Sequence, residues 1–165
     1  MPTIKIRWAR PEDAAQMIRL WKLLAVYERH PPEVVSISEA QVRRDGFGPD
    51  RRFECLLVER DGAVVGLAAF IQDYATWTGQ SGMFVHDLIL EESARGGGVG
   101  RKLMAALASI AKARGWQRLD LNVRPWNPAR RFYGRLPMKH RDDLMIYAMD
   151  ANTIHDLAAD APALS

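Results

Sequence analysis

The chain has 165 residues, 48% hydrophobic and 26% charged, which is typical of a single globular domain. A formal charge of +3, from 23 basic and 20 acidic residues, is too small and too scattered to indicate nucleic-acid binding. No apolar run reaches the roughly 18–20 residues of a membrane span, and no signal-peptide core is present, so we expect a cytoplasmic protein without membrane contact.

The first third of the chain predicts a strand and two helices. Alternating apolar residues predict a strand over residues 3–8. Pro11, followed by two acidic residues, predicts the start of a helix that ends near Tyr27. Ser38 resembles the cap of a second, shorter helix, which should end within residues 45–49.

The middle of the chain predicts antiparallel strands. Strands over residues 53–60 and 63–71 are separated by Asp61-Gly62, a favourable two-residue hairpin turn. A second turn at residues 77–80 leads into a strand over residues 81–90.

The single cysteine, Cys55, lies in the apolar run of the first of these strands. We interpret it as an inert core thiol rather than a nucleophile, because no neighbouring residue favours its thiolate. A lone cysteine forms no internal disulfide, which is consistent with a reducing compartment.

The last third predicts a strand–helix–strand unit and further strands. Apolar residues at helical spacing predict a helix that stops at Arg114-Gly115. Beyond it the pattern predicts a strand over residues 118–123, a helix over 127–136, two strands over 138–142 and 144–149, and a short helix around 153–159. Hairpins followed by a strand–helix–strand unit indicate one α/β domain over residues 1–165.

The glycine-rich segment Arg95-Gly96-Gly97-Gly98-Val99-Gly100-Arg101 lies between a predicted strand and a predicted helix. Its unpaired N–H groups, the helix dipole and two arginines indicate an anion site, although such a turn can also serve only as a connection. The Gly-Lys-Ser/Thr of a P-loop is missing, and so is the third glycine of a dinucleotide fingerprint.

Residues 95–100 resemble the R/Q-x-x-G-x-G/A coenzyme A loop of the GNAT acetyltransferase superfamily. Asn127 and Tyr133 resemble the later element in which an Asn and then a Tyr face the cofactor. Several further segments fall in the order of the spermidine/spermine (diamine) acetyltransferases: Tyr27-Glu28-Arg29, Ile37-Ser38-Glu39, Asp45-Gly46-Phe47-Gly48, Trp77 with Gly79, and Trp126-Asn127.

The resemblance implies an α/β GNAT fold, with a mixed, mostly antiparallel central sheet and flanking helices. Its two parallel central strands, here residues 81–90 and 118–123, would splay apart to admit the pantetheine arm of acetyl-CoA. The cofactor-binding residues that it implies are Leu88, Ile89, Leu90, Arg95, Gly96, Gly97, Gly98, Val99, Gly100, Arg101 and Asn127.

The implied reaction is direct attack of a small-molecule primary amine on the acetyl thioester. The resemblance makes Tyr133 the general acid, whereas the residues alone also allow a packed tyrosine. His86 is either the general base or a hydrogen-bonded core residue, and Asn127 can also cap the helix it begins. The implied substrate-binding residues are Tyr27, Glu28, Trp77 and Asp87.

Two departures from the pattern of the polyamine enzymes argue against a polyamine substrate. Ala75 and His86 stand where the polyamine enzymes carry acidic residues, so we expect an acceptor with fewer positive charges, such as a small diamine or an amino-acid derivative. A protein or peptide N-acetyltransferase and a non-catalytic acyl-CoA-binding module remain alternatives. The resemblance also implies a homodimer. The histidines lack ligand-like spacing, so no metal site is expected.

Overall fold

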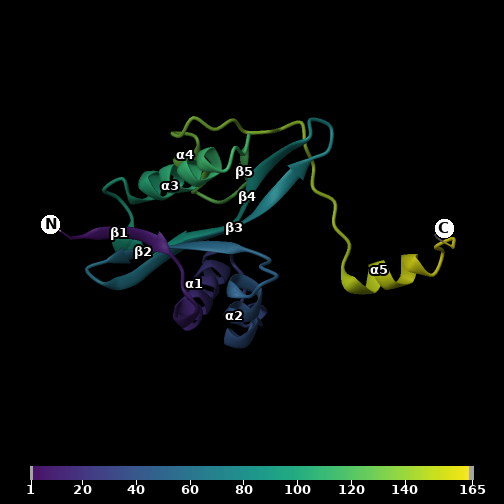
Figure 1. Ribbon diagram of the computed structural model, residues 1–165, viewed down its shortest axis with the longest axis horizontal. Helices are drawn as coiled ribbons and strands as arrows, with labels where there is room; N and C mark the ends of the chain where they lie inside the picture. The colour runs from purple at the N-terminus through teal and green to yellow at the C-terminus, as the bar shows by residue number, and fades with distance from the viewer. Residues whose placement is uncertain (1, 164–165) are drawn as a thin grey trace. The chain divides into compact units, whose positions relative to one another are not determined.

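The computed structural model describes residues 2–163, of which residues 2–129 form one compact unit and residues 130–163 a second. The first unit contains a five-stranded sheet whose spatial order follows the chain (Figure 1). Its strands are β1 (Ile4–Trp8), β2 (Glu54–Arg60), β3 (Ala63–Ala75), β4 (Gln80–Leu90) and β5 (Leu119–Leu121). All neighbouring strands are antiparallel except β4 and β5, which are parallel, and this confirms the predicted mixed sheet.

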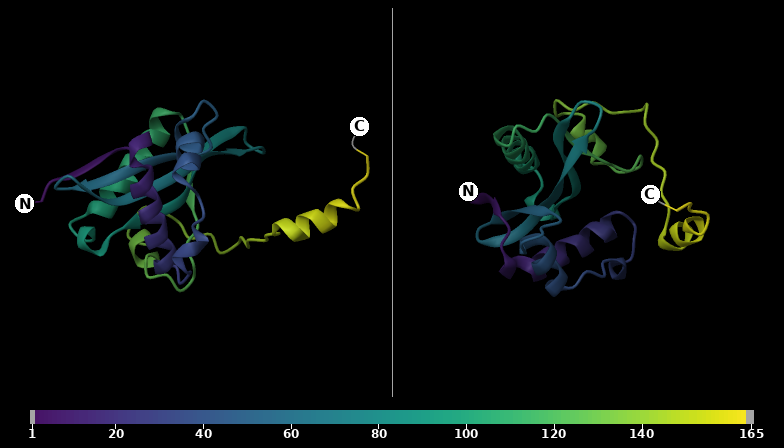
Figure 2. Two further views of the ribbon diagram at one scale, coloured as in Figure 1. Left: turned by 90° about the horizontal axis from the view of Figure 1, so that it is seen from below. Right: turned by 45° about the vertical axis from the view of Figure 1, so that its right-hand side comes forward.

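Helices cover both faces of this sheet. Helices α1 (Ala14–Tyr27) and α2 (Glu39–Phe47) lie on one face, and α3 (Val99–Ala113) lies on the other (Figures 1 and 2). The α1 face buries Met17 and Leu20 against Leu57 and Leu67 of the sheet, and α3 buries its own apolar stripe, which includes Leu103 and Leu107. Short 3-10 turns occupy Pro11–Asp13, Pro32–Val34 and Glu92–Ala94. This layering follows from the apolar faces that the sequence predicts.

Polar contacts position the starts of α1 and α2. The Arg7 guanidinium on β1 donates to Asp13, just before α1, and to Glu59 on β2. The pKa of the Asp13 carboxyl is therefore held below its usual range, chiefly by the hydrogen bonds from Arg7. Ser38 caps α2 by accepting from the Gln41 amide, and the Gln41 side chain accepts from the Ser38 amide, which confirms the predicted cap.

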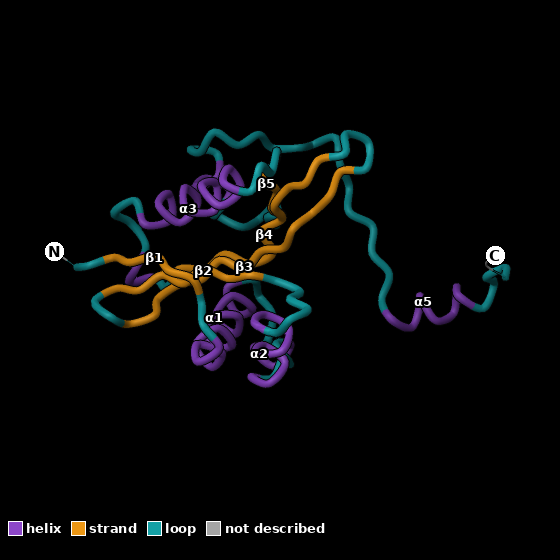
Figure 3. The backbone as a smooth tube through the Cα atoms, viewed as in Figure 1, coloured by secondary structure: helices purple, strands orange, loops and turns teal. Residues whose placement is uncertain are grey.

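The hairpins form as predicted, with one longer strand. Asp61 and Gly62 both take left-handed φ values, 51° and 84°, as a two-residue turn of this kind requires. Strand β3 runs to Ala75, past the predicted end, because its distal part pairs with the start of β4 in a long hairpin (Figure 3). Strand β5 is shorter than predicted because only three of its residues pair with β4.

The second unit overturns part of the sequence prediction. It contains α4 (Arg130–Tyr133) and α5 (Ala151–Ala158), and the expected short C-terminal helix is confirmed. The strands predicted over 138–142 and 144–149 are wrong, since neither of these described segments pairs with another strand. Short residue runs alone predicted them, but a strand needs a ladder partner, and the side chains of Leu144–Tyr147 stay 63–89% exposed.

The helix predicted over residues 127–136 is also largely wrong. Only Arg130–Tyr133 is α-helical. Asn127 and Pro128 precede this single turn, and Gly134 and Pro137 after it disfavour continuation. Among the described helices, none is long and apolar enough to cross a membrane.

Candidate active site

A β-bulge in β4 organises the site. Opposite β4, Phe70 of β3 pairs with Val85 and Ala69 pairs with Asp87, so His86 is the extra residue. Before the bulge, the Met83 N–H donates to the Arg118 carbonyl, on the β5 side. Because backbone groups alternate along a strand, the extra residue shifts this alternation by one position in the second half of β4.

The second half of β4 has an open backbone edge. Strand β5 pairs only with Met83–Val85, and no described strand continues along Leu88–Leu90 on that side. The Glu91 amide donates to the Val65 carbonyl of β3, so by alternation the peptide groups of Ile89 also face β3. Those of Leu88 and Leu90 face the open side, where the Leu90 carbonyl accepts from Arg95 Nε at 3.0 Å.

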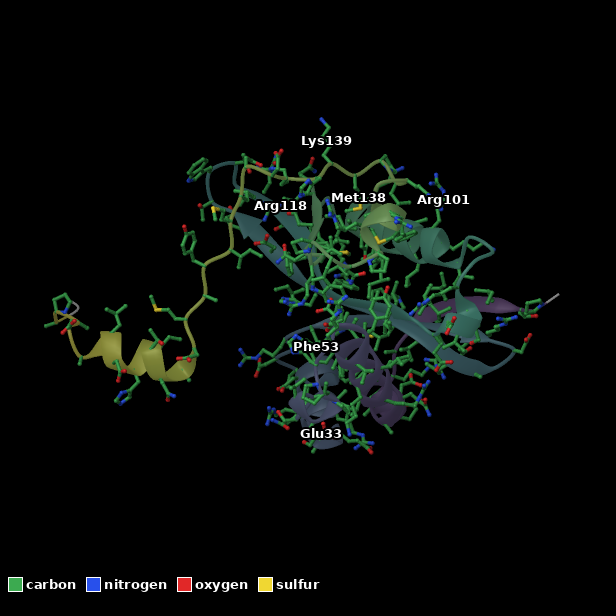
Figure 4. All side chains as sticks on the ribbon, turned by 180° about the vertical axis from the view of Figure 1, so that it is seen from behind. Glu33, Phe53, Arg101, Arg118, Met138 and Lys139 are labelled. Atoms are coloured by element: carbon green, nitrogen blue, oxygen red, sulfur yellow. The ribbon has the colours of Figure 1, made fainter. Side chains whose placement is uncertain are left out.

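A cavity of about 620 Å³ lies beside the bulge, between α1, the segment 34–37 and strands β3 and β4. Its walls are mainly apolar, and its ionisable lining residues are few. Figure 4 shows one wall residue, Phe53, on the side of the sheet that α1 and α2 cover, and the centroid of its ring lies 5.8 Å from that of Trp21 in an edge-on contact. The ionisable residues of the lining are Glu28, His30, Arg52, His86 and Asp87. A small molecule with a polar end fits such a site.

Asp87 is the partly buried carboxylate of this cavity. Burial raises the pKa of its carboxyl, while His86 and Trp21 oppose that shift. The Trp21 indole approaches Asp87, but its buried Nε1 makes no well-formed hydrogen bond with any described residue. No ion pair joins Asp87 to a described residue, so its charge is available to a cationic ligand.

His86 lies on the cavity wall and is exposed, which excludes the buried core position considered from the sequence. Its ring packs edge-on against Phe84 with centroids 4.7 Å apart. An exposed imidazole beside a carboxylate is suited to proton transfer.

The other predicted substrate-binding residues take different positions. Glu28 lines the cavity and pairs with Arg124 at 3.0 Å. Tyr27 lies outside the lining and has the Arg95 guanidinium 4.9 Å from its ring centroid. Trp77 is fully exposed at the tip of the β3–β4 hairpin and does not line the cavity. Arg124 and His30 join the site, although neither belongs to a motif in the sequence.

The glycine-rich loop presents bare backbone at the start of α3. Gly96, Gly97 and Gly98 have φ values of 88°, 57° and 76°, a conformation that favours glycine. A Cβ atom at any of the three would meet nothing within 4 Å, so the loop is open to a ligand. The N–H groups of Gly98, Gly100 and Arg101 have no backbone acceptor among the described residues. Arg101 projects outward from α3 (Figure 4).

The remaining predicted residues divide between the two units. In the first, Asn127 is buried, and its Oδ1 accepts from the Ala129 amide at 2.8 Å, so it acts as a local cap. In the second, Tyr133 ends α4 with its ring 5.1 Å from that of Phe132. Cys55 is buried in the core, and burial raises the pKa of its thiol. The described residues contain no cluster of metal-ligating side chains.

Comparison with known families decides the assignment. A model of the acetyltransferase (GNAT) family matches residues 16–136, which span the cavity, the bulge and the glycine-rich loop. The chain belongs to the GNAT acetyltransferase family. Members of this family use acetyl-CoA, and the chain is therefore an acetyl-transferring enzyme.

Relatives that are named as acetyltransferases align with most of this chain. A mouse thialysine N-epsilon-acetyltransferase is 28% identical over 96% of this chain and 99% of its own. The corresponding bovine protein is 33% identical, covering 77% of this chain and 78% of its own. A human spermidine/spermine N(1)-acetyltransferase-like protein 1 is 26% identical over 96% of this chain but 24% of its own.

Solved structures support the same fold. An integron cassette protein from V. cholerae superposes with a TM-score of 0.77 at 23% identity, over 94% of this chain and 97% of its own. A ribosomal-protein-alanine N-acetyltransferase from Brucella melitensis superposes with a TM-score of 0.70 at 24% identity, over 90% and 99%. The observed architecture is thus that of a GNAT fold.

Proposed function

We propose that this enzyme transfers an acetyl group from acetyl-CoA to the primary amine of a small molecule that carries few positive charges. The observation that carries the proposal is the open edge of β4 at Leu88 and Leu90, directly after a bulge residue that lines a small-molecule cavity. Relatives named for acetylation of thialysine, an amino acid with a side-chain amine, support an acceptor of this size.

The chemistry of the loop fits the diphosphate of acetyl-CoA. Three open glycines and the unpaired amides at the start of α3 provide hydrogen-bond donors, and Arg101 adds positive charge. The outward peptide groups of Leu88 and Leu90 would bind the pantetheine amides as an added strand. Ile89, expected in the same role, has its peptide groups facing β3 and its side chain buried in the core, so we assign it no direct contact with the pantetheine. Arg95 would hold the loop against Tyr27 and the end of β4.

When bound, acetyl-CoA supplies a thioester that a neutral amine can attack. An alkyl ammonium has a pKa of about 10.4, so deprotonation at pH 7 costs about 4–5 kcal/mol. We assign His86 to accept that proton, because its ring is exposed on the cavity wall beside Asp87. Asp87 would attract the ammonium form. Tyr133 would donate a proton to the departing sulfur.

A thiol-release assay tests the proposal. The protein is incubated with acetyl-CoA and a panel that includes thialysine, short diamines, spermine and an N-terminal peptide, and free thiol is followed with a colorimetric reagent. Cys55 does not interfere, because the only cysteine of the chain is buried. We expect turnover of small amines and weaker turnover of spermine. Coenzyme A binding without turnover, or turnover of the peptide alone, would contradict the proposal.

The Tyr133→Phe variant tests the proton donor in the same assay. We expect kcat to fall about 100-fold while coenzyme A affinity is kept. Tyr147→Phe, the same change at an 89% exposed tyrosine, is the matched control and should behave as wild type. Equal kinetics of the two variants would remove Tyr133 from the proposal. A homodimer and a cytoplasmic location remain predictions, the first of which light scattering tests.

A further inference from the structure

Arg124 places a positive charge next to two residues of the cavity lining, although no motif includes it. It lies three residues after β5, and its Nε donates to Glu28 Oε2 at 3.0 Å. Its Nη2 lies 3.2 Å from His30 Nε2. Glu28 and His30 both line the cavity, so the guanidinium borders the place where an acceptor would lie.

A contact between Arg29 and Trp126 also holds the segment 124–126 in place. The Arg29 guanidinium lies 4.0 Å from the centroid of the Trp126 ring, two residues after Arg124. Arg29, two residues after the end of α1, takes a left-handed φ of 64°. Three contacts therefore join the end of α1 to residues 124–126, and the position of Arg124 does not depend on a single exposed ion pair.

The two carboxylates of the cavity, Glu28 and Asp87, consequently differ in whether a cation compensates their charge. The charge of Glu28 is compensated by Arg124, whereas Asp87 has no ion-pair partner among the described residues. One uncompensated carboxylate complements an acceptor with one ammonium. A second ammonium near Glu28 would have to displace the guanidinium or lie beside it, and like charges placed together are costly.

We propose that Arg124 is a specificity-determining residue that disfavours acceptors with a second positive charge and favours acceptors whose far end is neutral or anionic. This inference rests on the proposed function and narrows its substrate class. A carboxylate at the far end of the acceptor, near Glu28 and His30, would find the guanidinium donors of Arg124 beside it. A zwitterionic amino acid with a side-chain amine has this charge arrangement.

Three acceptors of matched length test the proposal: 1,5-diaminopentane, pentylamine and 5-aminopentanoate, whose far ends are positive, neutral and negative. Steady-state kinetics are measured for wild type and Arg124→Gln. In the variant we expect kcat/KM for the diamine, relative to pentylamine, to rise about five- to tenfold, mainly through KM. The ratio for 5-aminopentanoate relative to pentylamine should fall. Unchanged ratios would overturn the proposal.

Three further variants separate local charge from other effects. Arg43→Gln removes the same charge and an Arg–Glu pair, Arg43–Glu39, away from the cavity, and should leave the ratios at wild-type values. Arg124→Lys, which keeps the charge, should retain most of the discrimination. Adding Glu28→Gln to Arg124→Gln should abolish the gain for the diamine. If Arg43→Gln reproduces the shift, or if the double variant keeps it, the proposal is wrong.

The outcomes also separate this inference from the proposed function. If wild type acetylates none of the three amines or the wider panel, the proposed function fails. If wild type acetylates them and Arg124→Gln lowers kcat equally for all three, Arg124 has only a structural role and the specificity proposal alone fails.

Discussion

The first half of β4 lies between two strands, whereas its second half has a strand on one side only. Met83–Val85 pairs with both β3 and β5, while Leu88–Leu90 pairs with β3 alone. The two halves are similarly apolar, so composition does not distinguish them. The difference comes from the short β5 and from the bulge at His86, which together leave the backbone groups of Leu88 and Leu90 facing an open edge. An open edge of this kind suits an amide-containing ligand, and a fully paired strand does not.

The largest effect is expected when the outward N–H of Leu88, in the open second half of β4, is removed. In Leu88→Pro the missing N–H bonds no described strand, so we expect folding to be kept. Coenzyme A affinity should fall about 30-fold, from one lost hydrogen bond of about 2 kcal/mol. Isothermal titration calorimetry measures the affinity. Leu88→Ala, which keeps the backbone N–H, is the control. Equal affinities in the two variants would contradict the proposal that bound pantetheine pairs with this edge as an added strand.

A smaller effect is expected where the open half leads into the loop. Gly98→Ala places a Cβ in open space at a left-handed position, and we expect about a tenfold loss of coenzyme A affinity. Gly62→Ala is the matched control, because Gly62 is also left-handed and open but lies in the β2–β3 turn. Both variants should lose similar stability, measured by thermal unfolding. Equal losses of coenzyme A affinity would show that strain, not contact, explains the result.

The smallest effect is expected at Asp87, where the two halves meet. Because burial raises its folded-state pKa above the unfolded value, the folded protein binds the proton more tightly. Wild-type stability therefore falls as pH rises through the interval between the two values. Asp87→Asn should raise Tm by about 1–3 °C at pH 7 and change it little below pH ~3.9. A Tm difference that does not vary with pH would contradict this.

Local patterns predicted most of the first unit, because its strands and helices obey short-range rules. The Asp61-Gly62 turn and the Ser38 cap are each specified by neighbouring residues, and both formed. The segment 144–149 is a short apolar run like that of a buried strand, but whether it pairs depends on distant residues. Its failure to form a strand shows that a short apolar run does not by itself specify a strand.

The residues of the candidate site were likewise predicted only in part. Glu28 and Asp87 were expected at one substrate site, and the structure places both on one cavity. Arg124 was not expected, because it meets Glu28 across 96 positions of sequence and no local pattern encodes that approach. Trp77 was expected in the site from resemblance, but its position at a hairpin tip leaves it fully exposed.

Residue-resolved amide hydrogen exchange with and without coenzyme A tests the central claim most directly. In the free protein, the Met83 and Val85 amides should be protected by β5, and the Leu88 and Leu90 amides should exchange faster. Addition of coenzyme A should slow exchange at Leu88 and Leu90 and change Met83 and Val85 little. If Leu88 and Leu90 show no gain in protection while coenzyme A is bound, the open half of β4 is not its binding edge.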